Sequence, residues 1–142
     1  SMFVSEFMST RLVTVEMDDR LSVVKEILEN LKIHHLLVIE SQKVFGVISD
    51  RDLYKALSPN IGTMTETLKD VATLNKRVHQ IMSRQPIVLT ANATIDEAIA
   101  VFSAHTISCI PIVDDAMKPI GIVTIRNILN ILNKKKWSFS NY

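Results

Sequence analysis

Three side chains suited to holding a nucleoside phosphate follow one short apolar segment: Ser49, Arg51 and Asp52. An arginine can grip phosphate oxygens through paired hydrogen bonds, and a carboxylate can accept two hydrogen bonds from a ribose diol. Gly46, three residues before Ser49, would let a backbone come close to whatever lies at the end of the segment. If Ser49 begins a helix, the unpaired amides there favour negative charge, so the cluster predicts a nucleoside-phosphate site.

The same residues have an explanation that needs no ligand. Ser49 and Asp52 have the spacing of a capping box, in which a hydroxyl and a carboxylate each satisfy a backbone amide at the start of a helix. For a single copy of the pattern, capping is the more common explanation. The choice between the two therefore depends on the rest of the chain.

The chain contains two copies of one unit. Aligning Met8-Ser9 with Met82-Ser83 makes polarity and order agree along about 50 positions. Residues 46–52 align with residues 121–127, so Thr124, Arg126 and Asn127 stand where the first copy has Ser49, Arg51 and Asp52. This agreement indicates a duplication.

Each copy predicts the order strand, helix, strand, strand, helix. The apolar stripes of the two long helices fall at helical spacing, as Leu21, Val24, Leu28 and Leu31 in the first copy and as Ile95, Ala98, Ile99 and Phe102 in the second. Asp18-Asp19 are candidate caps of the first helix, and Thr94 with Glu97 forms a capping box for the second. Residues 36–39 and 44–48 are short, β-branched runs that predict a pair of strands.

The segment between the copies predicts a helical connector. Ser58-Pro59-Asn60 stops the preceding helix, and Thr63 with Glu66 has the spacing of a capping box. One face would then carry Met64, Leu68, Val71 and Leu74. We therefore predict a first unit at residues 1–57, the connector at 58–76, a second unit at 77–133 and a tail at 134–142.

The duplicated unit, with its glycine, two apolar residues, Ser or Thr and then Asp, resembles the cystathionine-β-synthase (CBS) domain. The likeness runs from about residue 4 to residue 132, and a tandem pair of this kind is called a Bateman module. The resemblance implies an α+β fold of two β-α-β-β-α units packed as a pseudo-two-fold pair, as in stand-alone bacterial-type CBS-pair proteins. It also implies clefts that bind adenine nucleotides or other adenosyl ligands, and assembly into dimers.

The family pattern assigns candidate ligand contacts residue by residue. For the first cleft these are Val13, Thr14, His34, His35, Gly46, Ser49, Arg51 and Asp52. For the second cleft they are Val88, Ile107, Ser108, Thr124, Arg126 and Asn127. Asn127 stands where the family pattern has its ribose-binding Asp, so the charge-assisted hydrogen bonds of a carboxylate are lost. We expect one competent cleft and a second, weaker one.

Other kinds of site find less support in the sequence. His34 and His35 are adjacent on a strand and point to opposite faces, and the chain has one cysteine, so no metal site is expected. No nucleophile-base pair suggests catalysis, and no bound cofactor is expected. The net charge of +1 and the absence of an apolar run of roughly 18 residues argue against nucleic-acid and membrane partners. The basic and aromatic tail is read as a solvated end.

These observations predict a non-enzymatic, cytoplasmic sensor that binds AMP, ADP, ATP or S-adenosylmethionine in the cleft between its CBS units. It would act as a homodimer on an effector protein that the sequence does not identify. The alternative is a ligand-independent dimerisation or scaffold module in which Ser49 and Asp52 only cap a helix. Asn127 and the lack of an effector domain in the sequence favour that alternative.

Overall fold

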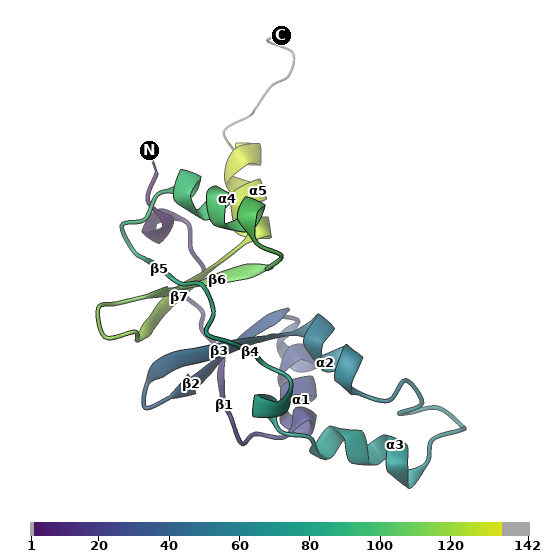
Figure 1. Ribbon diagram of the computed structural model, residues 1–142. Helices are drawn as coiled ribbons and strands as arrows, with labels where there is room; N and C mark the ends of the chain where they lie inside the picture. The colour runs from purple at the N-terminus through teal and green to yellow at the C-terminus, as the bar shows by residue number, and fades with distance from the viewer. Residues whose placement is uncertain (1, 135–142) are drawn as a thin grey trace. The chain divides into compact units, whose positions relative to one another are not determined.

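The computed structural model describes residues 2–134, which form two compact units (Figure 1). Val13–Pro86 forms one, here called the repeat-1 unit. The other, the repeat-2 unit, combines the chain up to Leu12 with the chain from Ile87 onward. Residues 2–12 thus pack with the second repeat rather than with the first. Apart from Lys134, the predicted tail lies outside the described residues.

The repeat-1 unit contains a four-stranded sheet, three α-helices and two short 3-10 helices, at Thr73–Asn75 and Val78–Gln80. In chain order its elements are β1 (Thr14–Glu16), α1 (Leu21–Leu31), β2 (His35–Glu40), β3 (Lys43–Ser49), α2 (Asp50–Ala56), α3 (Leu68–Ala72) and β4 (Ser83–Arg84). The strand order is β1-β2-β3-β4, with β1 parallel to β2 and the other pairs antiparallel.

The repeat-2 unit repeats this order with a three-stranded sheet. Its elements are β5 (Leu89–Thr90), α4 (Ile95–Ala104), β6 (Cys109–Val113), β7 (Pro119–Thr124) and α5 (Ile125–Lys134). The strand order is β5-β6-β7, and α4 and α5 lie next to each other within this unit (Figure 1). The α+β class and the strand-helix-strand-strand-helix order of both repeats are confirmed.

Each unit has its own apolar core, which includes residues of the predicted helix stripes and of the strands. In the repeat-1 unit, α1 buries Leu21, Val24 and Leu28, while Leu31 at its end is partly exposed. These side chains pack against strand residues such as Leu36 and Ile48. In the repeat-2 unit the core consists of Val4, Ala93, Ile95, Ala98, Ile110, Ile112, Val123 and Ile128. The α1 and α4 stripes therefore face the cores as predicted.

The two central glycines make room for the chain itself. In the repeat-1 unit, β4 pairs with β3, and a Cβ on Gly46 would lie 2.8 Å from the backbone oxygen of Ser83 and 3.0 Å from Met82 Sδ. In the repeat-2 unit, a Cβ on Gly121 would collide with the side chain of Met8. The space that a side chain on Gly46 would occupy is therefore taken by a neighbouring strand of the same unit.

The connector helix begins later than predicted. α3 starts at Leu68, where Thr67 and Asp70 form the capping box. The predicted cap residues serve a turn instead, since the Thr63 hydroxyl donates to the Asn60 oxygen (2.7 Å) and Glu66 Oε1 accepts from the Gly62 amide (2.9 Å). The Thr63 hydroxyl thus donates to the preceding turn and does not cap a helix, and the chain continues through turns and bends up to the α3 cap at Thr67. The first turn of the predicted helix is therefore a bent loop.

Of the two long helices, α4 has the side-chain cap that the sequence predicts and α1 does not. α1 follows Arg20, which makes no side-chain cap, and Asp19 Oδ2 accepts from the Glu16 amide (2.7 Å) to close the preceding turn. The expectation that Asp18 or Asp19 caps α1 is therefore wrong. At α4 half of the predicted capping box is formed, since the Thr94 hydroxyl accepts from the Glu97 amide (3.2 Å) and so caps the helix.

Candidate functional site

Ser49 and Asp52 meet where β3 runs directly into α2. The Ser49 hydroxyl accepts from the Asp52 amide (3.1 Å), and Asp52 Oδ2 accepts from the Ser49 amide (2.9 Å). The capping box is thus formed, and it uses one oxygen of the carboxylate. α2 is short, seven residues long, so its dipole adds little to anion binding. The chemistry of this junction therefore rests on its side chains.

Asp50, which the sequence reasoning missed, joins the start of β2 to the start of α2. Its backbone amide donates to the His34 oxygen (2.9 Å), and its Oδ2 lies 2.8 Å from His34 Nδ1. Its other oxygen accepts from the Arg51 amide (2.7 Å). Partial burial works against ionisation, but the hydrogen bonds from His34 and Arg51 outweigh it and lower the pKa of Asp50. This carboxylate is therefore ionised at neutral pH.

His35 lies against the same cluster from β2. It stands opposite Ser49 in the β2-β3 register and is half-buried. Burial lowers the pKa of His35, against the opposing influence of Asp50 and the smaller one of Asp52. The ring is therefore neutral at pH 7. The structure thus brings together His34, His35, Ser49, Asp50, Arg51 and Asp52 at one junction.

The remaining residues predicted for the first cleft lie on the sheet. Thr14 stands opposite Leu37 in the β1-β2 register, and the Val13 oxygen accepts from the Leu37 amide (3.1 Å). Both are therefore tied to β2 two residues beyond His35. Gly46 stands opposite Val38 and Arg84 in mid-sheet and lies away from the junction.

The matching junction of the repeat-2 unit is satisfied by its own side chains. Asn127 Oδ1 accepts from the Thr124 amide (2.8 Å) and hydroxyl (3.0 Å), and the Thr124 hydroxyl accepts from the Asn127 amide (3.1 Å). Asn127 Nδ2 donates to Ser9 Oγ (3.3 Å). Both ends of the asparagine amide are thus engaged within this unit.

The other residues predicted for the second cleft flank this junction. Arg126 is exposed on α5, Ile107 and Val88 are half-buried, and Ser108 immediately precedes β6. Cys109 is buried in β6 opposite Thr124, as expected for a small core residue.

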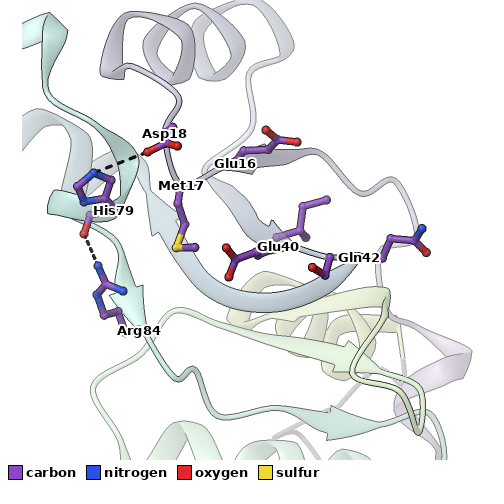
Figure 2. A pocket seen from close by; sticks show the side chains of 9 residues that line it. Glu16, Met17, Asp18, Glu40, Gln42, His79 and Arg84 are labelled. Atoms are coloured by element: carbon purple, nitrogen blue, oxygen red, sulfur yellow. Dashed lines mark hydrogen bonds and ion pairs between the residues drawn. The ribbon is translucent and has the colours of Figure 1, made fainter.

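An open pocket of about 710 Å³ lies elsewhere on the repeat-1 unit, at the opposite ends of β1 and β2 (Figure 2). Its lining includes Glu16, Met17, Asp18, Ile39, Glu40, Ser41, Gln42, His79 and Arg84. Figure 2 shows His79 between two partners, with its ring 4.0 Å from Asp18 Oδ1 and its backbone oxygen accepting from Arg84 (3.0 Å). None of the residues predicted for ligand binding lines this pocket.

Residues 2–134 show neither a cluster that could bind a metal ion nor a helix that could span a membrane. No group of three or more His, Cys, Asp or Glu side chains there is arranged to hold a metal ion. In that part of the chain, no helix has the length and apolar character needed to cross a membrane.

Comparison with known proteins decides the family. The model of the CBS domain matches this chain twice, at residues 4–59 and 78–134. The chain belongs to the CBS domain family. The CBS domain-containing protein DDB_G0289609 of Dictyostelium discoideum is 30% identical over 133 residues, which cover 92% of this chain and 91% of that protein. The L-aspartate semialdehyde sulfurtransferase of Methanocaldococcus jannaschii is 27% identical, but this CBS pair spans only 24% of its length.

Solved CBS pairs share the fold over nearly the whole chain. The CBS domain pair of protein MJ0100, in complex with 5′-methylthioadenosine and S-adenosyl-L-methionine, has a TM-score of 0.79 and 26% identity and covers 95% of this chain and 98% of its own. CBSX2 of Arabidopsis thaliana, in complex with AMP, has a TM-score of 0.78 and 26% identity and covers 96% and 99%. Both of those CBS pairs were solved with an adenosyl ligand.

Proposed function

We propose that this CBS pair is a regulatory module that binds one adenosyl ligand, such as AMP, ADP, ATP, S-adenosylmethionine or 5′-methylthioadenosine. The observation that carries the proposal is the likeness, end to end, to two CBS pairs whose complexes hold such ligands. Binding would act by population shift, because a ligand favours whichever conformation it binds more tightly.

The β3–α2 junction is where we propose that the ligand binds. Asp52 uses one carboxylate oxygen for capping and would offer the other to the ribose hydroxyls. The exposed guanidinium of Arg51 would hold a phosphate or another polar group. Val13, Thr14 and His35 would contact the adenine. Asn127, already bound to Thr124 and Ser9, supports a single strong site per chain.

We also propose an oligomeric state, a partner and a location for this module. Exposed apolar side chains on α2 (Tyr54) and α5 (Ile125 and Leu129) support a homodimer formed through helices. An effector protein would respond to the ligand-bound conformation of this module. We propose that this CBS pair is located in the cytoplasm. We propose no catalytic activity, since the similarity to the sulfurtransferase is confined to about a quarter of that enzyme.

A ligand-independent scaffold is the second candidate. The observation in its favour is that both capping boxes, at Ser49 and at Thr124, are complete without a ligand. Such a module would assemble with partners whatever the nucleotide level.

Thermal unfolding with a ligand panel separates the two candidates. At about 1 mM, a ligand with a dissociation constant near 10 µM should add roughly 2.7 kcal/mol, which raises the melting temperature by several degrees. We expect at least one of AMP, ADP, ATP, S-adenosylmethionine and 5′-methylthioadenosine to do so, with guanosine monophosphate as the control. If the protein melts cooperatively and none of the five adenosyl ligands raises its melting temperature, the proposed ligand-binding function is contradicted and the ligand-independent scaffold is favoured.

A further inference from the structure

The open pocket at the ends of β1 and β2 combines acidic side chains with apolar ones. Three exposed carboxylates line it, those of Glu16, Asp18 and Glu40. Figure 2 shows these carboxylates spread around the side chain of Met17. Met17 and Ile39 are half-buried and supply apolar surface in the same pocket. We call this site the acidic pocket.

The positive groups of the acidic pocket do little to balance its charge. The Arg84 guanidinium donates to the backbone oxygen of His79 (3.0 Å), and the His79 ring lies 4.0 Å from Asp18 Oδ1. In the described part of the chain, no lysine or arginine forms an ion pair with any of the three carboxylates. The pocket therefore keeps an excess of negative charge that a basic segment could neutralise.

The tail of this chain has the complementary composition. Lys134, Lys135 and Lys136 carry three positive charges, and Trp137 and Phe139 follow closely. A cavity of about 710 Å³ lies in the range of roughly 300–1,000 Å³ that holds small ligands, so it has room for one large aromatic side chain. The sequence alone indicates a solvated end, whereas the acidic pocket matches this tail in both charge and apolar character.

The short tether between α5 and Trp137 favours a tail from a second copy of the chain. Trp137 lies three residues beyond Lys134, the last residue of α5, so a fully extended chain places it about 10 Å from that helix at most. α5 belongs to the repeat-2 unit, whereas the acidic pocket belongs to the repeat-1 unit. A tail that a second copy supplies is not subject to this limit.

We propose that residues 134–139 of one copy dock in the acidic pocket of a second copy. The lysines lie against the three carboxylates, and Trp137 packs against Met17 and Ile39. Two copies that exchange tails in this way form a closed, two-fold symmetric pair. The contact needs no adenosyl ligand, so a chain that binds none of those ligands can still form it.

The fluorescence of Trp137 reports the contact directly, because the chain has one tryptophan. A tryptophan that packs in the pocket emits at shorter wavelength and is quenched less by acrylamide than a tryptophan in water. We expect both properties in the full wild-type chain at low salt. Dilution should reverse them because the copies separate, and added salt should do so because it screens the charge pairs.

Charge reversal in the acidic pocket should weaken the contact. Glu16→Lys combined with Glu40→Lys changes two exposed side chains, and it should raise the protein concentration at half-maximal change roughly tenfold. Glu26→Lys combined with Asp115→Lys makes the same change of charge at exposed positions elsewhere and should leave that concentration unchanged. Far-UV circular dichroism and cooperative thermal unfolding check that both variants fold.

A mixture of two variants distinguishes a second copy from the same chain. The first carries Glu16→Lys and Glu40→Lys and keeps Trp137, whereas the second keeps the acidic pocket and carries Trp137→Phe. We expect the second variant, which has no tryptophan, to shift the emission of the first to shorter wavelength.

Two results would overturn the proposal. If Trp137 has the same emission and the same quenching in the wild type and in the charge-reversed variant, the tail does not occupy the acidic pocket. If charge reversal exposes Trp137 but the mixture shows no shift, the tail docks within its own chain and the exchange between copies is wrong. Neither result bears on the binding of an adenosyl ligand.

Discussion

Gly46→Ala is expected to destabilise the repeat-1 unit by about 2 kcal/mol, within the range for overpacking a tight interior. The added methyl group would lie 2.8 Å from a backbone oxygen of β4, and a backbone pinned by strand pairing cannot move aside cheaply. Relief requires β4 to separate from β3. Urea unfolding followed by far-UV circular dichroism measures the loss.

Gly121→Ala is the matched control, because the two glycines occupy the same place in their repeats. The three atoms nearest to its Cβ would all belong to the side chain of Met8, which is flexible and can turn away. We expect a smaller loss than at Gly46. A loss at Gly121 equal to or greater than that at Gly46 would show that the close approach of β4 does not explain the first glycine.

Asp52→Asn is expected to weaken adenosyl binding about tenfold while leaving the stability of the unliganded protein within about 0.5 kcal/mol of the wild type. An asparagine can keep the cap, since Asn127 accepts from Thr124 through its Oδ1 in just this way. What it loses is the charge that strengthens hydrogen bonds to ribose hydroxyls. Calorimetric titration with the ligand that stabilises the protein most measures the affinity.

Asp70→Asn provides the control for this change. Asp70 closes the equivalent capping box at α3 with Thr67, far along the chain from the proposed site. Its substitution should leave ligand affinity unchanged. If Asp52→Asn and Asp70→Asn both bind the ligand like the wild type, Asp52 is a capping residue alone.

The sequence predicted the repeated architecture well because that architecture depends on local patterns. The α1 and α4 stripes and the apolar runs of β2 and β3 repeat with helix and strand periods, and the second copy supports each assignment of the first. The start of the connector helix was predicted wrongly because Thr63-Glu66 and Thr67-Asp70 both have the spacing of a capping box. The structure decides between them because the Thr63 hydroxyl and the Glu66 carboxylate both bond to the turn before Thr63, at Asn60 and Gly62.

The features that were missed depend on pairing between distant residues. Nothing near Gly46 shows that Met82 and Ser83 will cover it, because that contact arises from the β3-β4 pairing. Asp50 could have been found from the β2-β3 hairpin, since the register that places His35 opposite Ser49 brings residues 34 and 50 together. The Ser49-Asp52 cap is local, and the sequence offered it as the alternative to a ligand site.

The most direct test of the account is a nuclear magnetic resonance titration of the ¹⁵N-labelled chain with AMP and with S-adenosylmethionine. The account predicts that the largest amide shifts fall on His35, Asp50, Arg51 and Asp52, with smaller changes at Ile125, Arg126 and Asn127 of the matching junction. Shifts confined to the pocket around Glu16, Glu40 and Gln42, or no shifts with either ligand at millimolar concentration, would contradict it.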